Sequence, residues 1–344
     1  MKTLHIVPEL NAANGVYVVA RLLAREGGDA EVVGLDEGLR RIGEADVDEV
    51  WVHGMWLPKE WAACRRVLKA GKRLVRMTHG SLSPVYLKRQ SPFKKWLVGP
   101  IECWALRRCA KIVATCGAEE EWIREYLGKR CPEIVVEDVK RFFDFSRKER
   151  IGRVEERGNF ISRVERVEGD ESVFNIEAQR HRGAEKDELY LLYLGRRHPL
   201  KGVEFLEAAV AELNAGSRSR ESKLDSGIGN FSNVEGLSAH CSTSTSNFDS
   251  RQIELKIVSD AFGEEKEKVW EWCDVLVLPT LSENFGLVIA EALERGKRVI
   301  TTDGAPAWGD GNDYGGRLIY LKGYRDGSDA ERVRLLRDAL MMMV

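Results

Sequence analysis

Short apolar runs alternate with amphipathic stretches along the first 145 residues of the chain. Thr3–Val7 and Glu49–His53 have the length and residue types of buried strands, while Gly15–Arg25 carries Val and Leu at helical spacing. The same alternation returns after residue 188, in runs such as Leu189–Leu194 and Val275–Leu278. Strands that alternate with helices predict parallel sheets with helical crossovers, so we expect an α/β protein with two such domains.

The remaining elements follow the same pattern. The predicted strands are Thr3–Val7, Glu31–Leu35, Glu49–His53, Arg73–Thr78, Lys111–Thr115, Leu189–Leu194, Glu254–Val258, Val275–Leu278, Arg298–Thr302 and Arg317–Leu321. The predicted helices are Gly15–Arg25, Trp61–Ala70, Glu119–Leu127, Val203–Leu213, Glu264–Trp272, Leu287–Arg295 and Asp329–Met343.

Two stretches break this pattern. Residues 146–187 are dense in charges of both signs, and residues 214–251 are rich in Ser, Gly, Thr and Asn. Such compositions are typical of solvated linkers and loops that have no packed core. We therefore expect an N-terminal domain at 1–145, a charged linker or insertion at 146–187, and a C-terminal domain at 188–344 with a flexible loop at about 214–251.

Composition narrows the class of protein. A hydrophobic fraction of 43% and a net charge of −2 describe a globular chain, and the charge gives no argument for nucleic-acid binding. The seven cysteines are scattered without a C-x-x-C pair, which favours inert thiols in a reducing cytosol. The opening MKTLHIVPEL lacks the apolar stretch of a signal peptide, and no window approaches the ~20 apolar residues of a spanning helix. We expect a cytoplasmic protein.

The segment Pro279–Gly296 carries the first candidate site. A strand ends at Pro279, and a helix begins near Gly286, so free N–H groups and the helix dipole make a place suited to phosphate. Glu283 lies in the loop and Glu291 lies eight residues later on the helix. These acids suit sugar hydroxyls and a ribose diol. The alternative is that Glu283 only caps the helix and Glu291 is a surface acid.

The segment Gly195–Gly202, GRRHPLKG, carries the second. Arg196 and Lys201 bracket a turn directly after a strand, where two cations suit a diphosphate. The alternative is two solvated surface cations. Both segments follow strands of one predicted sheet, and the carboxyl ends of parallel strands share an edge. The two segments can therefore face one cleft.

Together these motifs resemble glycosyltransferase family 4. The run from Glu283 to Glu291 matches that family's E-x7-E signature, Gly195–Gly202 matches its donor-pyrophosphate motif, and Thr301–Pro306 is similar to the loop after the next strand in bacterial envelope-polysaccharide members. The likeness covers residues 1–143 weakly and 189–320 well, apart from 214–251. It implies a GT-B fold, with two Rossmann-like domains whose parallel sheets face each other across a cleft. It also implies a retaining hexosyltransferase that builds bacterial surface polysaccharide or lipopolysaccharide.

The resemblance also assigns roles to residues. It implies that Arg196 and Lys201 neutralise the diphosphate leaving group, that Glu283 holds the donor sugar, and that Glu291 meets the ribose. Backbone N–H groups are implied to bind sugar hydroxyls at Asn284, Phe285 and Gly286, and the distal phosphate at Leu287 and Val288. No metal and no other cofactor is expected, because fixed cations and a helix start take over the electrostatic work of a metal. Asp46-Val-Asp48 looks like the metal-binding D-x-D of another glycosyltransferase fold, but it precedes a strand and is interpreted as a chance match.

In the N-terminal domain, His79 matches the position where the family places a histidine beside the transferring sugar. His53 has the same local setting and is the rival, interpreted as a structural or acceptor-side residue. Gly15 stands where relatives often carry two glycines after the first strand, at the donor side of the cleft.

The segment 86–113 combines cations with tryptophans. The residues concerned are Lys88, Arg89, Lys94, Lys95, Trp96, Leu97, Trp104, Arg107, Arg108 and Lys111. This combination favours an interfacial helix on anionic lipid at the inner membrane face, although an ordinary packed helix has the same composition. The expected partners are a nucleoside-diphosphate sugar, a glycan or glycolipid acceptor, and a peripheral membrane contact, with no nucleic acid.

Two other functions fit the GT-B resemblance. One is a GT-B enzyme of other chemistry, such as a nucleotide-sugar epimerase or a phosphorylase. An epimerase needs further acids in the N-terminal cleft, and a cofactor-dependent phosphorylase needs a lysine for pyridoxal phosphate. Neither is identifiable in the sequence. The other is a non-catalytic assembly subunit that keeps the fold.

Overall fold

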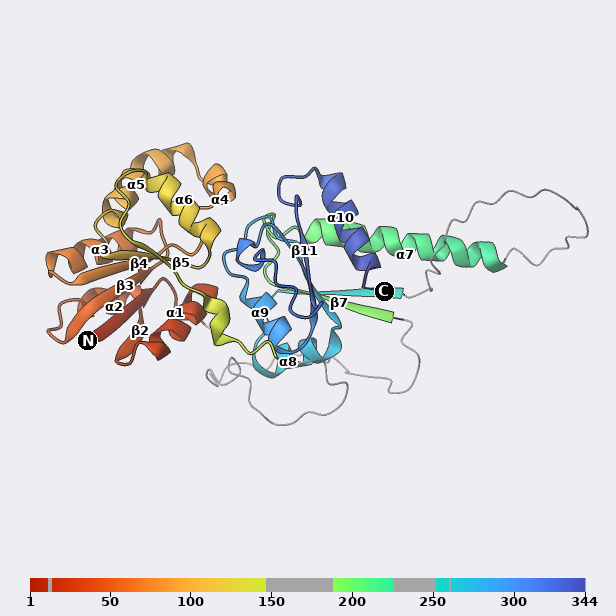
Figure 1. Ribbon diagram of the computed structural model, residues 1–344, viewed down its shortest axis with the longest axis horizontal. Coiled ribbons are helices and arrows are strands. Elements are labelled where there is room, and N and C mark those ends of the chain that lie inside the picture. Colours follow the sequence, from red (N-terminus) through yellow and green to blue (C-terminus); the bar gives the residue numbers. More distant parts are fainter. Residues whose placement is uncertain (12–13, 147–187, 226–251, 260, 344) are drawn as a thin grey trace, which may run out of the picture.

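The protein consists of two α/β domains that lie side by side (Figure 1). The computed structural model describes residues 1–11, 14–146, 188–225, 252–259 and 261–343. Each domain contains one parallel sheet with helices packed on it, which confirms the predicted fold class. The charged segment 147–187 and the stretch 226–251 lie outside the described residues.

The N-terminal domain contains a six-stranded sheet with the order β2-β1-β3-β4-β5-β6. All of its strand pairs are parallel. The strands are β1 (Lys2–Val7), β2 (Ala30–Gly34), β3 (Val47–His53), β4 (Arg73–Met77), β5 (Lys111–Ala114) and β6 (Ile134–Val136). The helices are α1 (Gly15–Glu26), α2 (Leu35–Arg41), α3 (Pro58–Lys69), α4 (Pro84–Arg89), α5 (Pro92–Leu106), α6 (Gly117–Leu127) and the short η1 (Val139–Phe142).

The C-terminal domain contains a five-stranded sheet with the order β11-β10-β9-β7-β8, again with parallel pairs. Its strands are β7 (Glu188–Leu194), β8 (Gln252–Val258), β9 (Val275–Leu278), β10 (Arg298–Thr302) and β11 (Leu318–Leu321). Its helices are α7 (Val203–Asp225), α8 (Gly263–Trp272), α9 (Leu287–Glu294), η2 (Pro306–Trp308) and α10 (Asp329–Met341).

The predicted strands and helices all form, with ends shifted by a few residues. The largest difference is α7, which continues to Asp225 although residues 214–225 were expected to begin a loop. That stretch contains Arg, Glu, Lys and Ser, which a helix accommodates at small cost, so its polar composition does not end the helix. The sequence pattern also missed α2, α4 and β6, all of which are short.

The central strands are buried on both faces. One hydrophobic cluster fills the side of the N-terminal sheet that packs on α3, α5 and α6, and it includes Leu4, Val50 and Ile112. A second cluster begins on the opposite side of that sheet, at residues such as Val75, and continues through Phe143 into the core of the C-terminal domain. The two domains therefore share a continuous apolar contact beside η1.

Polar contacts fix η1 against the C-terminal domain. The Lys140 ammonium donates to the Ala307 carbonyl at 3.0 Å and forms an ion pair with Asp310. Arg317 donates to the carbonyl of Phe145 at 2.6 Å. The last helix, α10, packs against α7 within its own domain (Figure 1). These contacts hold the carboxyl edges of the two sheets in a fixed relation.

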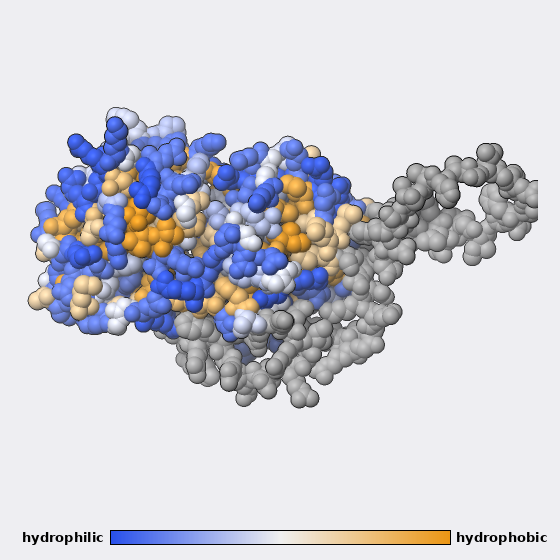
Figure 2. All heavy atoms as spheres, viewed as in Figure 1, coloured by the Kyte–Doolittle hydropathy of each residue, from blue (hydrophilic) through white to orange (hydrophobic). Residues whose placement is uncertain are grey.

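Much of the surface is polar, and exposed large apolar side chains are most numerous on α5. Figure 2 shows hydrophilic residues over most of one face of both domains, with hydrophobic residues gathered in smaller patches. Within the described residues, no helix has the length and apolarity needed to cross a membrane. Helix α5 nevertheless exposes large apolar side chains, namely Phe93, Trp96, Leu97, Ile101 and Trp104.

Candidate functional site

The loop between β9 and α9 is held by the loops that follow the neighbouring strands. The Leu281 N–H donates to the Leu200 carbonyl at 2.8 Å, which ties this loop to the turn after β7. The Glu283 N–H donates to the Gly304 carbonyl at 2.8 Å, which ties it to the turn after β10. Because β9 lies between β7 and β10, all three turns meet at one edge of the sheet.

Close packing places Lys201 at this edge. Gly202 has a φ of +63°, and a Cβ on it would lie 2.2 Å from the Pro279 carbonyl oxygen. Only glycine permits this approach. The preceding residue, Lys201, forms an ion pair with Glu283, and each of these side chains is 22% exposed. The structure therefore brings together the two predicted residues that lie 82 positions apart in the sequence.

Helix α9 begins at this pair with free backbone donors. Gly286 precedes it with a φ of +73°, and no side chain from the described part of the chain caps the helix. The first N–H groups of a helix have no intrahelical acceptor, so those of Leu287 and Val288 remain available. The Phe285 ring is buried between Phe143 and Trp308, whose indole N–H donates to the Phe285 carbonyl. Phe285 thus anchors the loop and leaves its backbone at the edge.

Glu291 lies farther along α9 and is buried. Its carboxylate oxygens lie 2.9 Å and 2.7 Å from Nζ of Lys266 on α8. Sequence reasoning did not single out Lys266, because no local pattern relates a lysine on one helix to an acid on the following helix. Both glutamates of the predicted signature are therefore paired with lysines.

In the turn after β7, the predicted cation Arg196 and its neighbour Arg197 differ in their surroundings. Arg196 is exposed, and its side chain has no ionic partner within the described part of the chain. Its neighbour Arg197 instead lies 2.6 Å from Glu207 on α7. Arg196 is thus free to meet an anion, and Arg197 is held away from one.

The D-x-D-like residues lie elsewhere. Asp46 pairs with the Lys2 ammonium at 2.8 Å, and Asp48 accepts from the Lys2 backbone N–H. Both stand at the amino end of the N-terminal sheet, the opposite end from the candidate site. Their position agrees with the interpretation of the match as accidental.

The N-terminal domain meets the loop before α9 through three segments. Gly80 lies against Asn284, whose side-chain amide lies 2.9 Å from the Thr115 hydroxyl. Ser83 and Ser282 are hydrogen-bonded at 3.2 Å. The predicted Gly15 lies at the start of α1, next to α9. A Cβ on Gly15 would lie 3.5 Å from Cδ1 of Leu287, which is an ordinary van der Waals contact. Gly15, the His79–Gly80 turn and the start of α9 thus form one candidate site between the domains.

Glu119 organises this part of the N-terminal domain. It is fully buried, and one of its oxygens accepts from the Thr78 hydroxyl and the Gly80 N–H, both at 2.6 Å. The other accepts from the hydroxyl and the N–H of Thr115, both at 2.8 Å. Glu119 therefore fixes the two loops that contact Asn284. The sequence placed Glu119 at a helix start, but not the loop contacts that make it important.

His79 and His53 lie next to each other. His79 follows β4 with a φ of +49°, and its Nε2 lies 2.9 Å from Nδ1 of the buried His53. Burial lowers the pKa of His79 to about 3. The two candidates from the sequence are therefore not independent alternatives. The half-buried His79 adjoins the interdomain contact at Gly80, and the buried His53 contacts the His79 ring from inside the domain.

The comparison with protein families supports the C-terminal assignment. Residues 188–322 match the model described as Glycosyl transferases group 1. No curated protein matches the chain significantly. The matched range contains both predicted motifs, the turn after β7 and the loop before α9.

Solved structures resemble the chain over its whole length. HepE of Anabaena, in complex with UDP, is 12% identical, with 100% of this chain and 95% of that one covered and a TM-score of 0.51. Sucrose-phosphate synthase from Thermosynechococcus elongatus is 13% identical, with coverage of 100% and 97% and a TM-score of 0.52. The UDP-forming α,α-trehalose-phosphate synthase of Burkholderia xenovorans, in complex with glucose-6-phosphate, is 10% identical, with coverage of 99% and 96% and a TM-score of 0.55. The chain therefore has the GT-B fold, and its C-terminal domain is similar to the group 1 glycosyl transferases.

Proposed function

We propose that the protein is a retaining glycosyltransferase that moves a hexosyl group from a nucleoside-diphosphate sugar to a glycan or lipid-linked acceptor in bacterial cell-envelope polysaccharide synthesis. The observation that carries this proposal is the convergence of Lys201, Glu283 and the uncapped start of α9 at one edge of the C-terminal sheet. UDP in HepE and glucose-6-phosphate in the trehalose-phosphate synthase are ligands of proteins with the same fold, and they support the substrate class.

The diphosphate fits the positive end of this arrangement. Arg196 and Lys201 supply two cations, and the N–H groups of Leu287 and Val288 supply donors with the helix dipole behind them. Charge builds up on the diphosphate as the sugar leaves, so these fixed groups stabilise the transition state more than the bound donor. A metal ion is not required for this step.

The sugar and the ribose fit the two glutamates. The Glu283 side chain is 22% exposed, and its carboxylate can accept hydrogen bonds from sugar hydroxyls once Lys201 turns to the diphosphate. Glu291 can accept from a ribose diol, with Lys266 balancing its charge. His79 precedes Gly80, which lies against Asn284, so its side chain can contact the transferring sugar from the N-terminal domain.

The acceptor side fits a membrane-associated substrate. The exposed apolar stripe of α5 includes Phe93 (68% exposed) and Trp96 (75% exposed), and exposed cations flank it at Lys95, Arg107 and Arg108. Aromatic residues between cations suit the headgroup region of an anionic bilayer. The sequence pattern assigned Lys111 to this surface, and that assignment is wrong. Lys111 lies on β5, with its ammonium 4.9 Å from the centroid of the Trp51 ring. We propose that α5 holds a cytoplasmic enzyme at the inner membrane face.

Vesicle flotation tests the membrane contact. The protein should float with vesicles that contain anionic phospholipid at low salt and should be released at high salt. Trp96→Ala should weaken this binding, while Phe262→Ala, which removes an exposed aromatic ring from the other domain, should leave it unchanged. A protein that sinks at low salt, or equal binding by both variants, excludes α5 as the contact.

A ligand screen tests the proposed activity. Thermal unfolding is followed with UDP-, GDP- and ADP-sugars, since a ligand that binds only the folded state raises the midpoint temperature. The sugar nucleotide that binds is then incubated with candidate acceptors, and proton NMR reports the anomeric configuration of the product. Transfer with retention supports the proposal. Conversion of the sugar nucleotide into its epimer identifies an epimerase, and binding without turnover identifies a non-catalytic subunit.

A further inference from the structure

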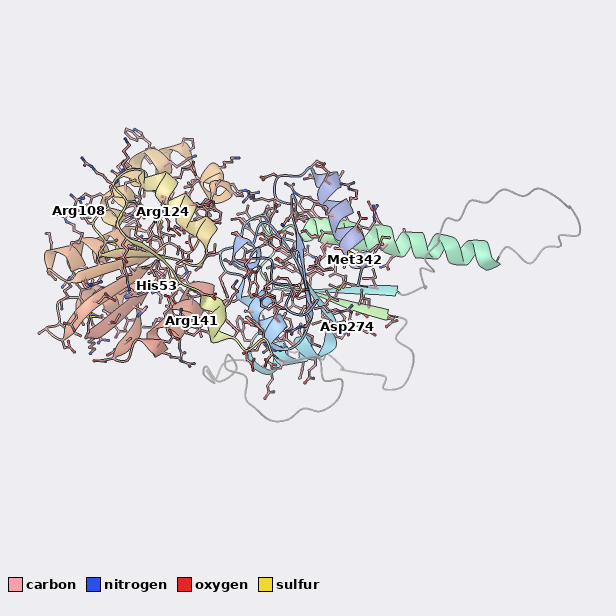
Figure 3. All side chains as sticks on the ribbon, in the orientation of Figure 1. His53, Arg108, Arg124, Arg141, Asp274 and Met342 are labelled. Carbon is pink, nitrogen blue, oxygen red and sulfur yellow. The ribbon has the colours of Figure 1, made fainter. Side chains whose placement is uncertain are left out.

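The Thr115 hydroxyl stands between two side chains on opposite sides of the domain boundary. It lies 2.8 Å from Oε2 of Glu119 in its own domain and 2.9 Å from the side-chain amide of Asn284 in the C-terminal domain. Glu119 belongs to α6, which contacts η2 of the C-terminal domain and on which Figure 3 labels Arg124. A hydroxyl has one proton and two lone pairs, so it can donate to only one of its two neighbours. The position of this proton therefore decides how the Asn284 amide is oriented.

Glu119 is the neighbour that receives the proton. Its carboxylate is fully buried, and each of its oxygens faces a backbone N–H, from Gly80 at 2.6 Å and from Thr115 at 2.8 Å. The Thr78 hydroxyl lies 2.6 Å from the first of these oxygens, and the Thr115 hydroxyl lies 2.8 Å from the second. All four contacts are satisfied when the carboxylate is ionised and only accepts. Thr115 thus donates to Glu119 and offers a lone pair to Asn284.

Asn284 then directs its amide nitrogen toward Thr115. An asparagine amide has a donating NH2 end and an accepting oxygen end, and a half-turn of the amide exchanges them without changing its shape. Only the NH2 end can bond to the lone pair of Thr115. The end near Thr115 also lies against Gly80, because a Cβ on Gly80 would be 3.2 Å from it. The oxygen occupies the other end, which has no hydrogen-bond partner among the residues that the structure describes.

The opposite orientation of the amide leaves buried groups unsatisfied. If the Thr115 hydroxyl donated to the Asn284 oxygen, its own oxygen would face Oε2 of Glu119 at 2.8 Å with no proton between them. A buried acceptor that loses a donor is costly, and the cost is larger for a charged group. The oxygen would also gain no second donor from the adjoining turn, because the Gly80 N–H already bonds to Glu119. The network is fully satisfied only with the nitrogen toward Thr115.

Asn284 follows the acid that is expected to hold the donor sugar. Its backbone N–H donates to Oε1 of Glu283 at 3.1 Å, and its side chain is half-buried. The family resemblance implies that this N–H binds a sugar hydroxyl, but in the structure it bonds to Glu283 instead. What Asn284 offers is its side-chain oxygen, which adds a second acceptor to the one that Glu283 supplies. The matching group on a ligand is a hydroxyl, because a hydroxyl can donate.

We propose that Glu119 and Thr115 are positioning residues that act across the domain boundary. They hold the Asn284 amide with its nitrogen toward Thr115, so that its oxygen accepts a hydrogen bond from a hydroxyl group of the bound ligand. That this hydroxyl belongs to a donor sugar rests on the proposed function, but the orientation of the amide does not. Asn284 thereby becomes a specificity residue through its side chain.

Proton NMR of the protein without added nucleotide tests the amide orientation. The NH2 signals of Asn284 are identified by their loss in Asn284→Asp. With the nitrogen toward Thr115, these protons give nuclear Overhauser contacts to the α protons of Gly80, and with the oxygen there they do not. We expect the contacts in the unaltered protein and in Thr115→Ser, and weaker ones in Thr115→Val and Glu119→Gln. Thr115→Val keeps the test available if Glu119→Gln does not fold. Absence of the contacts in the unaltered protein overturns the proposal, whether or not the protein transfers sugar.

Ligand binding tests the consequence. Thr115→Val keeps the shape of the side chain but removes the hydroxyl, and it should weaken binding of the sugar nucleotide selected by the ligand screen roughly tenfold, the value of about one hydrogen bond. Affinity for the free nucleoside diphosphate should not change. In an Asn284→Ala background the same substitution should have no further effect, because the acceptor it orients is gone. An equal loss in both backgrounds, or an equal loss for both ligands, indicates a merely structural role for Thr115 and overturns the proposal. A screen in which no sugar nucleotide binds contradicts the proposed function instead.

Discussion

The ammonium of Lys201 contacts the carboxylate of Glu283, so two groups expected to hold different parts of one ligand neutralise each other. A diphosphate between Arg196 and Lys201 offers the lysine a more highly charged partner. Its arrival frees the Glu283 carboxylate to accept hydrogen bonds from a sugar. This exchange predicts opposite effects for substitutions at the two positions.

Loss of Lys201 should weaken binding of the nucleoside diphosphate itself. Lys201→Ala removes a cation and leaves Glu283 without its partner beside the phosphates, so we expect the affinity to fall roughly 10- to 100-fold. Glu283→Gln should instead leave nucleoside diphosphate binding intact or strengthen it, and should abolish the additional affinity for the sugar. Titration calorimetry with the diphosphate and its sugar conjugate measures both effects. Equal losses for both ligands in both variants would contradict the exchange.

The neighbouring arginines provide a matched pair. The Arg196 side chain is exposed and has no ionic partner among the described residues, while Arg197 is paired with Glu207 on α7. We expect Arg196→Ala to weaken nucleoside diphosphate binding and Arg197→Ala to leave it within about twofold of the unaltered protein. Binding measured at several salt concentrations should give a smaller salt dependence only for Arg196→Ala. A larger effect at Arg197 would place the diphosphate elsewhere.

Ribose recognition should depend on Glu291. Its carboxylate is the acceptor expected for the ribose diol, so Glu291→Gln should reduce the preference for a ribonucleotide over its 2′-deoxy counterpart. Glu294 lies on the same helix, beside the backbone N–H of Asp144, and the variant Glu294→Gln serves as the control. Competition binding with the two nucleotides measures the preference. A preference that survives at Glu291 and falls at Glu294 would refute the assignment.

The turn that carries Lys201 depends on glycine. Gly202→Ala would combine a φ of +63° with a Cβ 2.2 Å from the Pro279 carbonyl oxygen, and we expect a loss of about 3 kcal/mol or more in the free energy of unfolding. Gly263→Ala has a φ of +54° and no heavy atom within 4 Å, so it should cost only the backbone strain of about 1–2 kcal/mol. Denaturant unfolding of both variants compares them. Equal losses would show that the close approach to Pro279 contributes nothing.

A buried acid in the N-terminal domain should make stability depend on pH. Burial raises the pKa of Glu60 to about 7 from 4.5, so the folded state keeps a proton that the unfolded chain loses between these values. Because the folded state then binds more protons, the free energy of unfolding falls as the pH rises through this range. Glu60→Gln removes this titration, and its stability relative to the unaltered protein should rise by roughly 3 kcal/mol between about pH 5 and pH 8. A difference that does not change with pH would show that Glu60 is ionised in the folded protein.

Sequence reasoning located the elements and both halves of the candidate donor site, because strand periodicity and the positions of Lys201 and Glu283 after strands are local signals. It treated His53 and His79 as rivals, although the structure makes them neighbours. Their contact depends on the order β1-β3-β4, which brings together residues from three separate strands. Lys266 and Glu119 were missed for the same reason, since their partners are set by packing between elements. Lys111 was assigned to the wrong surface because a charge-rich segment does not reveal where its helix ends and the next strand begins.

Release of nucleoside diphosphate from the sugar nucleotide selected by the ligand screen, in the presence of acceptor, is the most direct test of the donor site. We expect the unaltered protein and Arg197→Ala to turn over at similar rates, and Lys201→Ala to be slower by orders of magnitude while it remains folded by circular dichroism. Equal rates for Lys201→Ala and the unaltered protein would contradict the placement of the diphosphate between the turn after β7 and the start of α9.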